Sequence, residues 1–160
     1  MSQQQRFDQS MAEWQLKPFG MLSNTELYAL LQARVSVFVL EQACAYQELD
    51  GLDAPGLHLW CAAPETGVLA YARILPPGKR FAEASIGRVL TTEAARGQGL
   101  GRQLMARAIR VAEDQFGRTG IRISAQCYLE HFYAAFGFEA VGEQYLEDDI
   151  PHQEMFRRAG

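Results

Sequence analysis

The sequence predicts a single α/β domain in which helices flank a mixed sheet of mostly antiparallel strands. Its 160 residues suit one domain rather than two. Apolar residues make up 48% and charged residues 21%, close to globular averages, which excludes a disordered chain, a collagen or a coiled coil. Segments typical of strands and helices follow in the order strand, helix, strands, helix, strand, helix and strand. Residues 1–10 are polar and expected to be disordered, so we expect the domain to span 11–160.

The first part of the domain is expected to contain a short strand and a helix. The strand is expected at Ala12–Lys17. Ser23-Asn24-Thr25-Glu26 has the pattern of a capping box, which predicts the start of a helix. Apolar residues then recur with a helical period to about Leu40. An acidic loop is expected over Ala43–Gly56.

Three strands are expected in the middle of the chain: Leu57–Ala63, Val68–Leu75 and Ala84–Thr91. Pro64–Gly67 is short enough to join the first two strands as a hairpin. Pro76-Pro77-Gly78 separates the second strand from the third.

The last part of the chain alternates helices and strands. Apolar residues on one side of the segment from Gly99 to Phe116 predict a long amphipathic helix. Gly137 is placed to end a short helix over Tyr128–Phe136. The remaining strands are expected at Ile121–Gln126, Phe138–Leu146 and Gln153–Arg157.

Charge and cysteine content exclude several kinds of partner. Lys and Arg number 15 against 19 Asp and Glu, and a net charge of −4 does not suit nucleic-acid binding. We expect no membrane partner, because no apolar stretch approaches the ~20 residues of a membrane helix. The N-terminal residues lack the apolar core of a signal peptide. Cys44, Cys61 and Cys127 form no CxxC pair, so we expect no metal and a reduced, cytoplasmic protein.

The strongest chemical signal is the glycine-rich segment Arg96-Gly97-Gln98-Gly99-Leu100-Gly101-Arg102, between a strand and a long helix. A helix start offers unpaired N–H groups and partial positive charge, and glycines let a phosphate approach the backbone. This helix has no capping side chain, and Arg102 opposes the helix dipole. A bound phosphate would satisfy both features. The alternative is a glycine turn needed only for packing.

Two common nucleotide loops fit this segment less well. A Walker A loop ends in Gly-Lys-Ser/Thr, whereas Arg102-Gln103 follows the last glycine here. In the dinucleotide pattern GxGxxG the third glycine would come one residue later. The next strand, Ile121–Gln126, also ends without an acidic residue for a ribose.

The pattern Arg/Gln-x-x-Gly-x-Gly at residues 96–101 resembles the pyrophosphate loop of the GNAT superfamily of N-acetyltransferases, which bind acetyl-CoA. Tyr133-Ala-Ala-Phe-Gly137-Phe138 is similar to the superfamily's Tyr-x-x-x-Gly-Phe segment. From about Leu27 to Met155 the chain resembles the ElaA group within it. The segments that carry this likeness are Val37-Phe-Val-Leu-Glu-Gln42, Tyr46-Gln-Glu-Leu-Asp50 with Asp53, Ala70-Tyr-Ala-Arg-Ile-Leu75, Ile86-Gly-Arg-Val-Leu90 and Asp149-Ile-Pro-His152.

The resemblance implies a GNAT-like fold in which a splayed pair of strands holds the CoA arm. It implies transfer of an acetyl group from acetyl-CoA to a small-molecule or peptide amine, by direct attack in a ternary complex. The backbone of Val89, Leu90 and Thr91 would line the pantetheine arm, and one N–H there would polarise the thioester carbonyl. Gln126 stands where many relatives carry an Asn that touches CoA. The residues expected to cradle the pyrophosphate are Gly97, Gln98, Gly99, Leu100, Gly101 and Arg102.

Tyr133 is the expected general acid, because a nearby phenol can donate a proton to the departing thiolate. The alternative is an aromatic core residue beside Phe132 and Phe136.

The general base is less clearly indicated. An amine with a pKa near ~10.4 must lose a proton before attack. Some superfamily members use a glutamate on the fourth or fifth strand, but Ser85–Leu90 and Ile121–Gln126 contain no carboxylate. The candidates are Glu41, Glu48, His58 and His152, of which His152 lies where the last strand should border the substrate cleft. For Glu41 and Glu48 the alternative is a solvated helix end or turn. For His58 it is a strand histidine bonded to an acid such as Asp50.

Two further expectations concern the whole domain. Without an evident base, a CoA-binding regulatory module that does no catalysis is the alternative function. An exposed edge strand would also allow the chain to pair into a homodimer.

Overall fold

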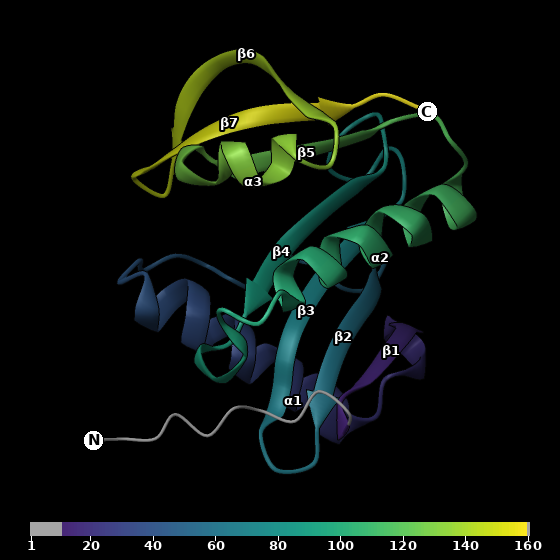
Figure 1. Cartoon of the computed structure of the whole chain (residues 1–160), viewed down its shortest axis with the longest axis vertical. Helices are drawn as coiled ribbons and strands as arrows, with labels where there is room; N and C mark the ends of the chain where they lie inside the picture. The colour runs from purple at the N-terminus through teal and green to yellow at the C-terminus, as the bar shows by residue number, and fades with distance from the viewer. Residues whose placement is uncertain (1–10, 160) are drawn as a thin grey trace.

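The computed structural model describes residues 11–159 (Figure 1). The expectation of a disordered segment at residues 1–10 falls outside the described part of the chain.

Within residues 11–159, seven strands form two antiparallel sheets. The first sheet has the order β1-β2-β3-β4 and the second has the order β5-β7-β6. The strands are β1 (Glu13–Pro18), β2 (Leu57–Ala63), β3 (Gly67–Leu75), β4 (Ser85–Thr91), β5 (Ile121–Gln126), β6 (Phe138–Glu147) and β7 (Ile150–Arg157). These bounds agree closely with the predicted strands, except at the start of β7.

The two sheets meet at a single parallel bridge between Ala84 and Ile121. There the Arg122 N–H donates to the Ala84 carbonyl at 3.0 Å. Beyond this point β4 and β5 diverge, as Figure 1 shows, so the mixed sheet of the prediction is two antiparallel sheets with one parallel contact between them. This is the splayed strand pair that the resemblance implied.

The last strand begins at Ile150, three residues before the predicted Gln153. Asp148 and Asp149 both have positive φ, 51° and 62°, which closes a two-residue hairpin and pairs Glu147 with Ile150 at once. Pro151 is tolerated because β5 pairs with β7 only from His152 onward. The missing N–H of Pro151 therefore leaves no gap on the β5 side.

The first helix, α1 (Asn24–Arg34), begins with the predicted capping box, in which Ser23 Oγ accepts from the Glu26 N–H at 3.0 Å. The helix was expected to reach about Leu40. Its α-helical hydrogen bonding ends at Arg34, and wider π-type turns continue over η3 (Val35–Glu41). Three valines in this segment crowd a regular α-helix because they are branched at Cβ.

Helix α2 (Leu100–Phe116) covers one face of the first sheet, and α1 with η3 covers the other. Buried side chains of α2, such as Leu104 and Ala108, pack in the main core with residues of β2, β3, β4 and β5. A smaller cluster joins Leu30 and Phe38 to Trp60 and Tyr71 on the opposite face. Within the described range, no helix is long and apolar enough to span a membrane.

Helix α3 (Glu130–Ala134) is shorter than the predicted Tyr128–Phe136, because a 3₁₀ turn over Cys127–Leu129 precedes it. Gly137, with a φ of 89°, follows the helix as expected. The short helix lies beside β6 and places Tyr133 next to the gap between β4 and β5.

Candidate active site

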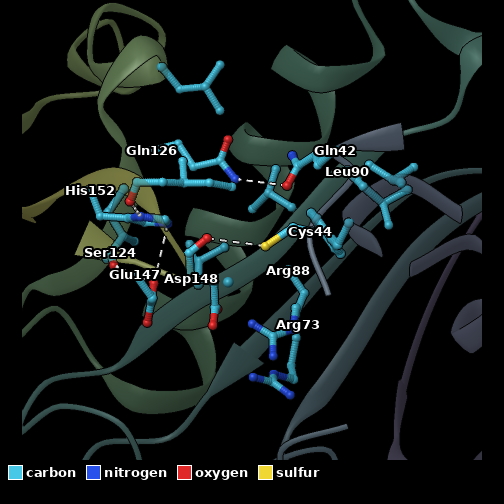
Figure 2. Close-up of a pocket in the computed structure, with 18 of the residues that line it drawn as sticks. Gln42, Cys44, Arg73, Arg88, Leu90, Ser124, Gln126, Glu147, Asp148 and His152 are labelled. Carbon is cyan, nitrogen blue, oxygen red and sulfur yellow. Dashed lines mark hydrogen bonds and ion pairs between the residues drawn. The ribbon is translucent and has the colours of Figure 1, made fainter. Parts of the chain in front are cut away.

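A cavity of about 780 Å³ lies where β4 and β5 separate (Figure 2). Both strands, η3, α3 and the turn between β6 and β7 line it. Most of the side chains that the sequence singled out meet here. Those that line the cavity are Glu41, Val89, Leu90, Thr91, Gly101, Gln126, Tyr133 and His152.

A β-bulge on β4 lines this cavity. The pairing of Tyr71 with Leu90 and of Arg73 with Gly87 leaves Arg88 and Val89 opposite one residue of β3. Arg88 has a φ of 51°, in the left-handed region that non-glycine residues rarely adopt. A bulge interrupts the hydrogen-bond ladder, so it frees backbone groups of this stretch from pairing with β3.

The Arg88 side chain anchors this bulge to a buried ion-pair network. Its guanidinium pairs with Glu48 and Asp50. Glu48 is 4% exposed and also accepts from Arg34 Nη2 at 2.8 Å, so it is not a solvated turn residue. The network comprises three arginines and three carboxylates: Arg34, Arg73, Arg88, Glu48, Asp50 and Asp53.

The arginines of the network lower the pKa of two of its acids, Asp50 and Asp53. Burial alone would raise the pKa of Asp50, but hydrogen bonds and charge from Arg73 hold it well below its usual value. Burial likewise opposes ionisation of Asp53, and Arg34 with Arg73 lower its pKa. The sequence analysis did not predict this network. Two arginines inside predicted strands could have indicated it, because buried arginines need partners.

His58 does not line this cavity, and its ring is bonded differently from the expectation. Its Nε2 lies 2.9 Å from the Asp53 carbonyl oxygen and its Nδ1 lies 2.7 Å from the Tyr71 hydroxyl. No carboxylate binds the ring. Burial lowers the pKa of His58, so it is a neutral structural histidine rather than a base in the cavity.

The glycine-rich segment forms an open loop at the start of α2. Gly99 is the N-cap residue with a φ of 78°, and no side chain caps the helix. Gly97 also has a positive φ, 77°, and a Cβ at either glycine would meet nothing within 4 Å. There is therefore free space beside the backbone at this uncapped helix start, as an anion site requires.

The loop residues fall into two groups. Gly97 and Gln98 line a second cavity beside the first, and both cavities share Glu41 and Arg96. The Arg96 side chain pairs with Glu41 and donates to the Thr91 carbonyl, so it links the loop to the ends of β4 and η3. The side chains of Leu100 and Arg102 do not line either cavity, and neither does Gly99. Leu100 is a core residue, which leaves only its backbone for ligand contact.

The position of Tyr133 is compatible with both interpretations that the sequence left open, a proton donor and a core residue. Its ring packs edge-on against Phe132 and Phe138 and is 7% exposed. It also lines the cavity. Burial and the nearby Tyr128 raise the pKa of Tyr133, so its hydroxyl keeps its proton at neutral pH. A proton donor needs this form.

Two hydrogen bonds link residues that line the cavity from different elements, as Figure 2 shows. Gln126 Nε2 donates to Gln42 Oε1 at 3.2 Å, and the Cys44 thiol donates to the Asp148 carbonyl at 3.3 Å. Both join the segment after η3 to the second sheet. Gln126 thus lies at the cavity, as predicted, while Gln42 and Cys44 were not expected there.

On the side of the second sheet, His152 lies opposite Gln126 in register and is 7% exposed. Ser124 and Glu147 line the cavity beside it. Ser124 was not among the predicted site residues. It lies two residues before Gln126 and therefore shares its strand face, which could have indicated it.

The family model for the GNAT acetyltransferase domain matches residues 24–158. This match assigns the fold to an acyltransferase family. An acyl-CoA N-acyltransferase from Pseudomonas aeruginosa has 49% identity and a TM-score of 0.86, covering 91% of this chain and 99% of that one. The chain belongs to the GNAT acetyltransferase family.

Its similarity extends to the ElaA group. ElaA from Escherichia coli is 42% identical over 92% of this chain and 97% of its own length. The crystal structure of that protein has a TM-score of 0.85, covering 92% of this chain and all of that one. A UPF0039 protein from Synechocystis is 39% identical over 91% of this chain and 94% of its own length.

Proposed function

We propose that this protein transfers an acetyl group from acetyl-CoA to an amine by direct attack in a ternary complex. One observation carries the proposal: a single cavity brings together the bulged strand β4, Tyr133 on α3 and His152 on β7. The cavity adjoins the open glycine loop at the start of α2. Each part of a thioester-dependent acyl transfer therefore has a candidate residue within one connected site.

The loop fits the pyrophosphate of acetyl-CoA. The start of α2 has no side-chain cap, and the space above Gly97 and Gly99 is free. Beyond the bridge at Ala84, the edge of β4 that faces β5 has no strand partner. The pantetheine arm carries amide groups that can pair with such an edge, along Val89–Thr91. Its narrow chain suits the gap between the splayed strands.

The chemistry follows from the same placement. The amine nitrogen bonds to the thioester carbonyl carbon, and the carbon–sulfur bond breaks. Backbone N–H groups released at the bulge stabilise the developing oxyanion. Tyr133 donates the proton that the thiolate takes, and His152 accepts the proton that the amine loses. Of the two base candidates that line the cavity we favour His152, because Glu41 is already engaged by Arg96 beside the glycine loop.

The acceptor that we propose is a small-molecule or peptide amine, and the compartment is the cytoplasm. Cys44, Cys61 and Cys127 are all unpaired, which suits a reducing compartment. Pairing of two chains through an edge strand stays a prediction, which gel filtration at several protein concentrations tests.

The test measures free thiol released from acetyl-CoA with a panel of amines, together with calorimetric titration of acetyl-CoA, ATP and NAD. We expect acetyl-CoA alone of the three to bind, and thiol release to depend on an amine. Binding of acetyl-CoA without turnover on any amine would favour the non-catalytic CoA-binding module. Preferential binding of ATP or NAD would contradict the proposal altogether. Omitting the amine controls for thioester hydrolysis.

A further inference from the structure

The carboxylate of Glu147 is held by three side chains at the end of the cavity near the second sheet. Its Oε1 lies 3.0 Å from Arg80 Nη2. Its Oε2 accepts from Ser124 Oγ at 3.4 Å and lies 3.3 Å from His152 Nε2. Figure 2 shows Glu147, Ser124 and His152 gathered on this side of the cavity. Both oxygens of this carboxylate therefore have partners, which favour one position of the side chain.

The contacts of His152 determine which of its nitrogens takes part in proton transfer. Nδ1 lies 2.7 Å from the carbonyl oxygen of Ile150, and a carbonyl only accepts, so Nδ1 carries a proton. Nε2 is then the nitrogen that can gain or lose a proton, and it faces Glu147. The ring stacks on Tyr145, with centroids 6.0 Å apart, and the Tyr145 hydroxyl hydrogen-bonds Ser124. These contacts set the orientation of the imidazole at the cavity wall.

The strand register produces this arrangement. In the β6–β7 hairpin Tyr145 lies opposite His152, and Glu147 lies two residues further along the same strand face. On β5 Gln126 lies opposite His152, and Ser124, two residues before Gln126, lies on the same strand face. The tight turn at Asp148 and Asp149 places Glu147 directly opposite Ile150 on the neighbouring strand.

We propose that Glu147 is the positioning residue for His152 and stabilises the imidazolium that forms when the acceptor amine gives up its proton. This assignment rests on the proposed acyl transfer. The proton passes from the amine nitrogen to His152 Nε2 as the carbon–nitrogen bond forms. Glu147 supplies the neighbouring negative charge, while Arg80 and Ser124 hold the carboxylate in place. Arg80 also partly compensates the negative charge of Glu147, because it pairs with the second carboxylate oxygen.

The charges around the imidazole allow a test based on the direction in which each substitution changes the protonation of His152. The charged or titratable groups that contact His152 or share its cavity wall nearby are Glu147, Tyr145, Asp148, Tyr133 and, through Glu147, Arg80. Removing an anion disfavours a neighbouring cation, and removing a cation favours it. Glu147→Gln and Arg80→Gln should therefore act in opposite directions on the protonation of His152.

The experiment measures kcat and KM across pH with the best amine found for the wild type. Glu147→Gln should lower kcat by up to ~10²-fold, since a base remains but is poorly held, and leave the KM for acetyl-CoA unchanged. The acid limb of kcat/KM should move to lower pH in Glu147→Gln and to higher pH in Arg80→Gln. Glu139→Gln, an equal charge change at an exposed site at the far end of β6, should match wild type.

A uniform loss of activity at all pH values, with no shift of the acid limb, would reduce Glu147 to a structural residue. A second readout needs no activity: NMR titration of the His152 ring, which is readily assigned because the chain has three histidines. Its midpoint should fall in Glu147→Gln and rise in Arg80→Gln. Identical midpoints in all variants would overturn the proposal. If wild type turns over no amine while these midpoints shift as stated, the pairing holds and the proposed reaction fails.

Discussion

Replacing Glu48 with glutamine should destabilise the fold more than any single change at an exposed acid. Glu48 is 4% exposed, and its carboxylate lies between Arg34 and Arg88. The six-residue network is neutral in wild type, with three arginines and three carboxylates. Glutamine keeps the shape of the side chain but leaves the network with one uncompensated positive charge.

The magnitude follows from the burial of the pair. Breaking a buried ion pair from one side costs about 3–5 kcal/mol. The lower end applies here, because Arg34 keeps its 2.7 Å contact with Asp53 and glutamine still offers a hydrogen-bond acceptor. A loss of about 3 kcal/mol should lower the melting temperature by roughly 6–12 °C for a domain of this size.

Urea and thermal unfolding followed by circular dichroism measure this loss. Glu65→Gln, in the exposed hairpin between β2 and β3, makes the same charge change and should stay within about 0.5 kcal/mol of wild type. The double variant Glu48→Gln/Arg88→Gln restores neutrality and should be less destabilised than the sum of the single variants. A loss below about 1 kcal/mol in Glu48→Gln would refute the view that this network anchors the β4 bulge.

Three other predictions follow from the site and its charges. Gly99→Glu should abolish acetyl-CoA binding in calorimetry while the protein stays folded, because its side chain and charge enter the free space at the start of α2; unchanged affinity would refute the phosphate loop. Tyr133→Phe should bind acetyl-CoA normally but lower kcat and kcat/KM together by ~10²–10⁴; a kcat near that of wild type would leave Tyr133 as a core residue. The free energy of unfolding, measured in urea across pH, should fall in two steps on acidification. The first step lies below pH ~6.5, because His58 takes up a proton in the unfolded chain while burial lowers its pKa in the folded protein. The second step lies below pH ~4, because Asp50 and Asp53 protonate more readily in the unfolded chain than in the folded protein. A constant free energy of unfolding over this range would contradict the assigned environments.

Local signals in the sequence predicted much of this structure. The capping box before α1 and the glycines before α2 depend on a few adjacent residues, so their effect does not require knowledge of the tertiary fold. The strands of the first sheet were also predictable, since their apolar runs lie between proline and glycine residues. Tyr133 was located in the cavity through a motif that extends over one helix end and the next strand.

Features that depend on distant contacts were not predictable in the same way. Arg73 and Arg88 stood inside strands and needed acidic partners, but the choice among Glu48, Asp50 and Asp53 requires the path of the intervening loop. The bulge at Arg88 follows from register against β3, which no local pattern specifies.

The start of β7 was missed for a different reason. Two consecutive aspartates in the left-handed region form its turn, a conformation more often supplied by glycine or asparagine.

The proposed reaction is direct transfer of the acetyl group from CoA to an amine within the cavity between β4 and β5. A single-turnover experiment with excess protein and carbonyl-labelled acetyl-CoA tests it most directly, with quenched samples divided between product and intact-protein mass spectrometry. We expect label to pass to the amine as an amide at the rate at which thiol is released, and the protein itself never to carry label. Labelled protein that forms before the amine is added, for example on Cys44 in the same cavity, would contradict direct attack. Thioester that stays intact with every amine would contradict acyl transfer itself.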